Sequence, residues 1–76
     1  MDLRQVFATN LRRLRNDREL SQEELADMAD INRTYISKLE NGATYVGLEI
    51  LGKLATTLKV DPAEMLRPPL RNRRAR

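Results

Sequence analysis

Three short segments of this chain each carry residues that begin an α-helix. Residues 21–24 read Ser-Gln-Glu-Glu, a capping box in which the serine hydroxyl and the glutamate carboxylate each accept from the other's backbone amide. Residues 61–64 read Asp-Pro-Ala-Glu and repeat the box, with proline at the first helical position. Asn32 is a third helix cap. Three internal helix starts within 76 residues predict an all-α fold.

Apolar residues recur at three- and four-residue steps beside these starts, as on the buried face of a helix. Glycine at 42 and the two prolines at 68 and 69 supply helix ends. The pattern predicts five helices, over about 2–17, 21–29, 32–41, 47–58 and 61–67. Hydrophobic staples flank three caps: Leu20 with Leu25, Ile31 with Ile36, and Val60 with Met65. The apolar faces of the first and fourth helices carry Leu3, Phe7, Leu11 and Leu14, and Leu48, Leu51, Leu54, Ala55 and Leu58.

The composition excludes several kinds of chemistry. The chain has no cysteine and no histidine, so it has no disulfide, no Cys/His zinc site, no thiol nucleophile and no imidazole base. The glycines match neither a dinucleotide-binding nor a P-loop motif. No stretch is apolar enough to span a membrane, and the first residues do not resemble a signal peptide. We therefore expect a cytoplasmic protein that is not an enzyme, with no metal, cofactor, small-molecule ligand or membrane partner.

The positive charge is concentrated at the C-terminus. The chain carries a net charge of +3, but residues 67–76 contain five arginines and no acid. The other 66 residues therefore have a net charge of −2, the difference between +3 and the +5 of this segment. The sequence predicts a folded domain over 1–67 and a basic, flexible tail over 68–76. An argument for nucleic-acid binding by the domain must rest on where its charges lie.

The second and third predicted helices are separated by only Asp30 and Ile31. This spacing is typical of a helix-turn-helix, in which the second helix enters the DNA major groove. At 100° per residue, Ile36 and Leu39 face the core and Glu40 points inward. The opposite face offers hydrogen-bond donors and no acid, which suits phosphates and base edges. It carries Arg33, Thr34, Ser37, Lys38 and Asn41.

Residues 21–26 (Ser-Gln-Glu-Glu-Leu-Ala) and 33–42 (Arg-Thr-Tyr-Ile-Ser-Lys-Leu-Glu-Asn-Gly) together resemble the phage-repressor/Cro-type (XRE) helix-turn-helix regulators. The leucines at 48, 51 and 54 and the segment 58–61 resemble that family's fourth and fifth helices. The resemblance covers about 5–67 and implies a compact five-helix lambda-repressor-like DNA-binding domain. Residues 33–37 also resemble the controller proteins of restriction–modification systems.

The resemblance implies roles for individual residues. Arg33, Thr34 and Lys38 would reach base edges, with Ser37 as a secondary candidate. Tyr35 leans toward the buried side, so it either packs or contacts DNA, and Gln22 would also brace the recognition helix. Arg15 and Glu40 match a structural ion pair. The residues expected at the DNA backbone are Gln22, Asn32, Tyr35, Asn41, Thr44 and Tyr45.

Two departures from the family pattern affect the turns. Asp30 occupies the turn position that usually holds glycine, so we expect a strained or slightly different turn. The loop over 43–47 lacks the frequent proline and the Ser/Thr cap. Backbone contacts by this loop are therefore the less secure part of the predicted interface.

The sequence predicts a sequence-specific regulator of transcription that binds double-stranded DNA. One recognition helix reads few base pairs, so we expect a homodimer on a palindromic operator, with the helix over 32–41 in the major groove. The fourth and fifth helices and the segment after them would join the two copies, with Met65, Leu66 and Leu70 as candidates. Such a protein acts by occupying DNA, where it blocks RNA polymerase or contacts it beside a promoter.

Two other functions remain open from the sequence. The chain could be an antitoxin-type interaction module with DNA-binding autoregulation, whose arginine tail folds onto a protein partner. It could also bind nucleic acid without sequence preference through that tail.

Overall fold

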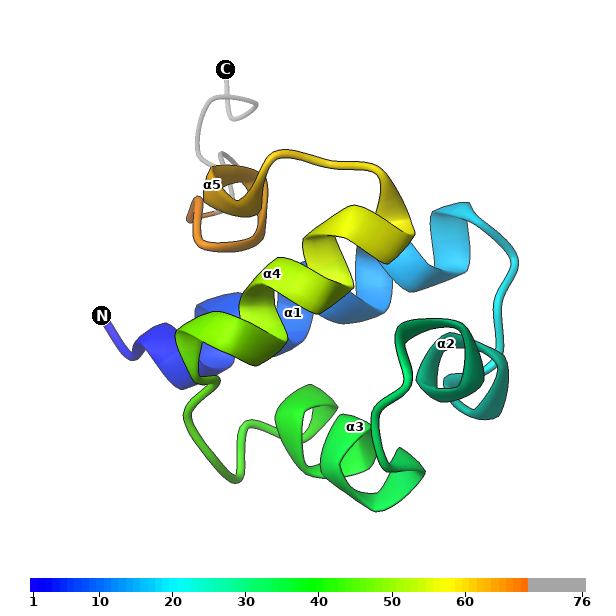
Figure 1. The fold of residues 1–76 in the computed structure, drawn as a ribbon. Coiled ribbons are helices and arrows are strands. Elements are labelled where there is room, and N and C mark those ends of the chain that lie inside the picture. The colour runs from blue at the N-terminus through cyan, green and yellow to red at the C-terminus, as the bar shows by residue number, and fades with distance from the viewer. Residues whose placement is uncertain (69–76) are drawn as a thin grey trace.

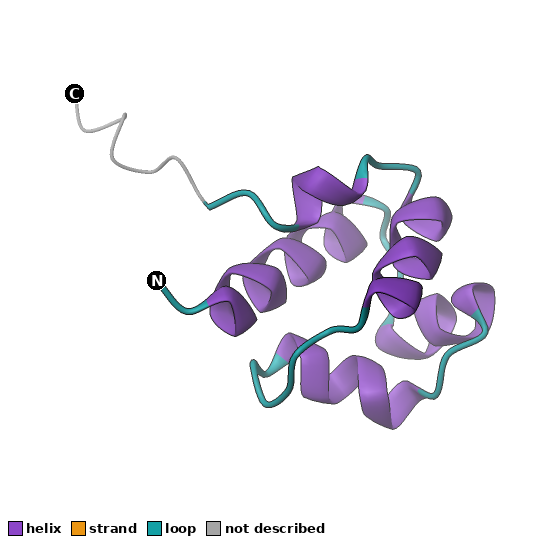
Figure 2. Cartoon of the chain, turned by 60° about the vertical axis from the view of Figure 1, so that its left-hand side comes forward, coloured by secondary structure: helices purple, strands orange, loops and turns teal. Residues whose placement is uncertain are grey.

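Five α-helices make up the part of the chain that the computed structural model describes, residues 1–68 (Figure 1). They are α1 (Leu3–Asp17), α2 (Gln22–Ala29), α3 (Arg33–Glu40), α4 (Leu48–Leu58) and α5 (Pro62–Met65). Figure 2 shows only helices and loops over these residues. The predicted all-α, five-helix architecture is confirmed. No helix within residues 1–68 is long and apolar enough to cross a membrane.

The start of α2 is the capping box that the sequence predicted. Ser21 Oγ accepts from the Glu24 amide at 2.9 Å, and the Ser21 amide donates to Glu24 Oε1 at 2.8 Å. At α3, Asn32 Oδ1 accepts from the Thr34 amide at 2.7 Å. The first four amides of a helix have no partner within it, and each of these caps supplies an acceptor for one of them, so the caps determine where the helices begin.

The second capping box is not formed, and that prediction was wrong, because neither of the two reciprocal side-chain bonds between Asp61 and Glu64 is present. Asp61 Oδ1 accepts from the Ala63 amide at 2.9 Å, so the aspartate does cap α5. The Glu64 carboxylate does not return to the cap, because it accepts from Arg67 Nη1 at 3.0 Å. The helix also ends at Met65 and not at residue 67. Of the predicted tail at 68–76, only Pro68 lies within the described residues.

The core lies where α1 packs against α3 and α5, and α4 against α2 and α5. Two predicted core positions are wrong. Leu3 and Leu48 are exposed, Leu48 at 84%. Both lie in the first turn of their helices, where no neighbouring helix covers them. The apolar spacing of three and four residues continues into that turn, although the side chains there are not buried. The largest fully buried apolar residues are Leu11, Leu25, Ile36, Leu39, Leu54, Leu58 and Met65.

Gly42 follows the end of α3 in a left-handed conformation that favours glycine. Its φ is +71°, and a Cβ at this position would displace the end of the Gln5 side chain on α1. The predicted end of the third helix at Asn41 and Gly42 is confirmed, because Asn41 is the C-cap. The glycine thereby lets the chain after α3 pass close against α1.

Candidate nucleic-acid interface

A turn of three residues connects α2 to α3. Asp30 has a left-handed backbone, with φ 58° and ψ 50°, and the Ile31 amide donates to the Ala26 carbonyl at 2.9 Å. Aspartate thus adopts the conformation for which the family pattern uses glycine, at the cost of some strain. Asn32 then caps α3 directly. Figure 1 shows the result, with α2 and α3 at the end of the molecule opposite to α5.

The outward side of α3 is polar and free of acid. Arg33, Thr34 and Lys38 are exposed, and Ser37 is half-buried. Within residues 1–68, neither Arg33 nor Lys38 forms an ion pair. The four residues predicted to read bases therefore lie on one helix, and its two cations have no acidic partner in the described chain.

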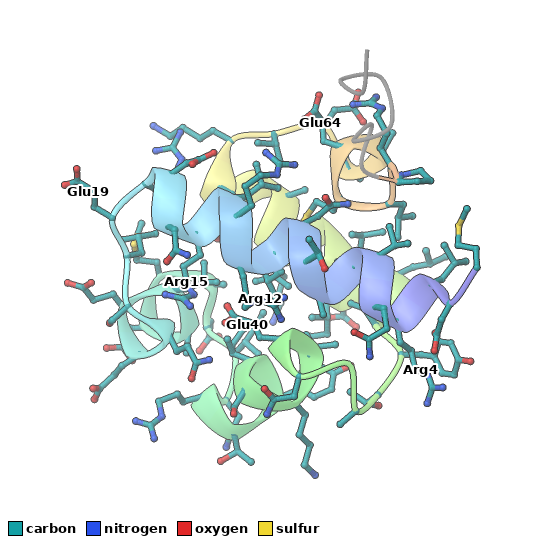
Figure 3. The ribbon with its side chains drawn as sticks, turned by 180° about the vertical axis from the view of Figure 1, so that it is seen from behind. Arg4, Arg12, Arg15, Glu19, Glu40 and Glu64 are labelled. Carbon is teal, nitrogen blue, oxygen red and sulfur yellow. The ribbon has the colours of Figure 1, made fainter. Side chains whose placement is uncertain are left out.

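The inward side of α3 carries the helix's one acid. The Glu40 side chain is 2% exposed and accepts from Arg15 Nε at 2.6 Å and from Arg15 Nη2 at 2.9 Å. Figure 3 shows Arg15 of α1 directed at Glu40. The hydrogen bonds to this carboxylate raise the pKa of the Arg15 guanidinium. The ion pair expected from the family resemblance is therefore present in the structure.

Two further donors complete this cluster. Gln22 Nε2, at the start of α2, donates to Glu40 Oε1 at 3.0 Å. Arg12 donates to the backbone carbonyl of Glu40, and Arg15 Nη1 donates to the Leu20 carbonyl at 2.7 Å. The cluster joins α1, α2 and the C-terminal end of α3, and so determines how α3 projects. Sequence reasoning missed Arg12; its only signal was its place one turn before Arg15.

Of the two roles expected of Gln22, the structure shows the contact that braces α3. Its amide nitrogen contacts α3 through Glu40, as a bracing residue would. The phosphate contact expected of the same side chain stays a prediction. Gln22 is half-buried, and its amide retains a second hydrogen and an oxygen for that purpose.

The other residues that are predicted to contact the DNA backbone lie on α3 and in the loop that follows it. Asn32 and Asn41 are exposed, and Thr44 is half-buried in the loop. Tyr35 is half-buried, and its hydroxyl donates to the Tyr45 carbonyl at 3.3 Å. This bond ties α3 to the loop before α4.

The Tyr45 ring lies away from α3. The Arg4 guanidinium of α1 stacks over this ring, 4.9 Å from its centre. Gly47 begins α4 without a side-chain cap, as the departure from the family pattern predicts. The ring of Tyr45 is thus directed to the N-terminal end of α1.

A second exposed surface is apolar. The side chains of Leu3, Tyr45, Leu48 and Leu66 are exposed and surround a pocket of about 200 Å³, whose floor includes Phe7 and Leu51. We call these four side chains the apolar face. They come from α1, the loop before α4, the start of α4 and the residue after α5, so only the tertiary fold brings them together.

The chain matches a known protein family over most of the described residues. The helix-turn-helix family model matches residues 11–65. This chain belongs to the helix-turn-helix family. The Neisseria hypothetical transcription factor of Neisseria meningitidis is 40% identical over 68 residues, which cover 90% of this chain and 64% of that protein. This chain therefore spans less than two thirds of that relative's length.

Two controller proteins are also similar. Control protein C.SmaI of Serratia marcescens is 38% identical over 66 residues, which cover 87% of this chain and 79% of that protein. The crystal structure of the restriction-modification controller protein C.AhdI from Aeromonas hydrophila superposes with a TM-score of 0.79 at 39% identity, covering 82% of this chain and 94% of that one. The helix-turn-helix family to which this chain belongs is one of transcription regulators and controller proteins, and not of enzymes.

Proposed function

We propose that this chain binds a palindromic operator as a homodimer, with α3 of each copy in the major groove. The observation that carries the proposal is the outward side of α3, where Arg33, Thr34 and Lys38 are exposed without an acid among them. The one acid of the helix is buried and paired. A helix in the major groove needs this distribution, since phosphates and many base edges accept hydrogen bonds.

Individual roles follow from position on the helix. Arg33, in the first turn of α3, binds guanine O6 and N7 in bidentate fashion. Thr34 contacts a thymine methyl or a phosphate, and Lys38 contacts a guanine one turn further along. Ser37 is a secondary base contact. The DNA backbone is held by Gln22, Asn32, Tyr35, Asn41, Thr44 and the main chain of Tyr45, whose ring belongs to the apolar face instead.

The apolar face supports the homodimer. Monomeric proteins rarely leave several large apolar side chains together in water, and one recognition helix reads only part of an operator. The structure corrects one candidate, because Met65 is fully buried in the core and cannot reach a second copy. Leu66 is exposed and belongs to the apolar face, whereas Leu70 lies outside the described residues.

Selection of bound oligonucleotides from a random pool tests the DNA-binding proposal. We expect one palindrome whose half-sites lie about one helical turn apart, roughly 34 Å. The full chain should prefer it over random DNA by ~10³ or more at physiological salt. A chain lacking residues 68–76 serves as the control and should keep this preference. Binding without preference that disappears in the truncated chain would support the nonspecific alternative instead.

The homodimer is tested by sedimentation of the full chain over a range of concentrations. Leu48→Glu places a charge in the apolar face and should raise the dimer dissociation constant by about tenfold or more. Thr56→Glu is the matched control, because Thr56 is exposed on the same helix outside the apolar face. Equal association by both variants would exclude this face.

A dimer of this kind would regulate transcription by occupying its operator. The relatives named as control proteins favour a role in the control of restriction–modification genes, in which the bound dimer blocks RNA polymerase or contacts it beside a promoter. The amount of protein sets occupancy through the monomer–dimer equilibrium. An antitoxin, by contrast, should have a toxin gene beside its own.

A further inference from the structure

Asn10 is a buried amide in the middle of α1. It is 3% exposed, on the apolar side of a helix whose neighbours there include Phe7 and Leu11. Its Nδ2 donates to the carbonyls of Met65 and Arg67, at 2.9 Å each. Both amide hydrogens are thus used, on residues more than fifty positions away in the sequence. A buried amide without such partners costs free energy, so these two bonds are what allow Asn10 to lie there.

The two carbonyls that Asn10 binds flank Leu66. This residue follows α5, which has only four residues and is too short to persist without tertiary contacts. The Leu66 amide donates to the Ala63 carbonyl at 3.1 Å, so the residue closes the last turn. Its side chain, 37% exposed, lines the pocket of the apolar face beside Leu3 and Phe7.

Of the contacts that hold this end of the chain, the bonds from Asn10 act on both sides of Leu66. Met65 is anchored by burial in the core, but Arg67 and Pro68 are exposed. The Arg67 side chain forms an ion pair with Glu64 of its own turn, and this pair is weak because both side chains are about half exposed. The bond from Asn10 is the one hydrogen bond within residues 1–68 that holds the backbone just after Leu66.

We infer that Asn10 is a positioning residue for the homodimer: it holds the backbone on both sides of Leu66, and so keeps that side chain in the apolar face where the second copy binds. This inference rests on the homodimer proposed above. Asn10 itself does not contact the second copy, since it is buried within its own subunit.

Asn10→Asp in the full chain tests the inference, because it keeps the size of the side chain and removes both donors. Asn16→Asp is the matched control, with the same change at an exposed position of α1. We expect Asn10→Asp to raise the dimer dissociation constant about tenfold, and Asn16→Asp to leave it within about twofold. Where Asn10→Asp does not fold, Asn10→Ser retains one donor and should weaken the dimer to a smaller extent.

Two readouts separate positioning from general loss of stability. Hydrogen exchange of the Leu66 amide should accelerate about tenfold in Asn10→Asp, while the Leu54 amide in the core of α4 changes much less. In a Leu66→Ala background, Asn10→Asp should add less than about threefold to the dissociation constant, because the two residues act through one contact. If the two substitutions instead raised the dissociation constant independently, so that their separate fold-changes multiplied in the double variant, the inference would be overturned.

The remaining outcomes are distinguishable. A wild-type chain that dimerises, with Asn10→Asp dimerising equally well, contradicts the role of Asn10 and leaves the homodimer intact. A wild-type chain that stays monomeric at all concentrations contradicts the homodimer and the inference together.

Discussion

The two sides of α3 place charged side chains in opposite environments. On the inward side, Glu40 is buried and accepts three side-chain hydrogen bonds, from Arg15 and Gln22. On the outward side, Arg33 and Lys38 are exposed and pair with no acid within residues 1–68. Water solvates the outward cations at little cost, whereas a buried carboxylate must be paired by the protein. The inward charge therefore serves the fold, and the outward charges remain available to DNA.

The largest effect is expected on the inward side. Glu40→Ala leaves the Arg15 guanidinium, whose side chain is 14% exposed, without its carboxylate. We expect the free energy of unfolding to fall by about 3–5 kcal/mol, because a buried charge loses its partner. Chemical denaturation followed by circular dichroism measures this loss.

Glu64→Ala is the matched control for that variant. Glu64 also pairs with an arginine, at 3.0 Å, but both side chains are about half exposed. Its removal should change the free energy of unfolding by less than about 1 kcal/mol. If the two variants lose equal stability, burial is not what distinguishes the two pairs.

A smaller effect, and a different one, is expected on the outward side. Arg33→Ala should weaken binding to the preferred operator by about 1–3 kcal/mol and abolish the preference at one base position. The free energy of unfolding of this variant should stay within about 0.5 kcal/mol of the wild-type value, because Arg33 is exposed. Binding to a panel of single-base operator variants measures both specificity and affinity.

Gln22→Ala provides the contrast, since Gln22 contacts the inward cluster. It should weaken all DNA sequences about equally and also lower stability, because a hydrogen bond to a buried carboxylate is lost. If Arg33→Ala likewise weakened every sequence to the same extent, Arg33 would not be a base-reading residue.

The smallest effect is expected at the turn that joins the two helices. Asp30→Gly relieves the left-handed strain and removes a negative charge from the C-terminal end of α2, against a greater entropy of the unfolded chain. We expect a gain of about 0.5–1 kcal/mol, seen as a rise of a few degrees in the melting temperature, with DNA binding retained. Asp30→Asn removes the charge alone and shows how much of the gain is conformational. A lower melting temperature for Asp30→Gly would contradict this account.

Local signals predicted the helices well because their causes are local. The capping box at Ser21, the cap at Asn32 and the glycine at 42 all act within one turn of the chain. The prediction failed at Glu64, where a nearby arginine competed for the carboxylate. It also failed at Leu3 and Leu48, because a helical period does not reveal where the covering helices end.

The sequence alone determined the five helices, the helix-turn-helix spacing and the outward side of α3, since each depends on residues within a few positions of one another. Tertiary structure alone decided the rest. The bond from Arg12 to the Glu40 carbonyl, the bonds from Asn10 to the carbonyls of Met65 and Arg67, and the apolar face each join segments that are far apart in the sequence. Their partners are distant in sequence, and no periodicity or local motif specifies which distant groups the packed helices bring within hydrogen-bond or van der Waals distance.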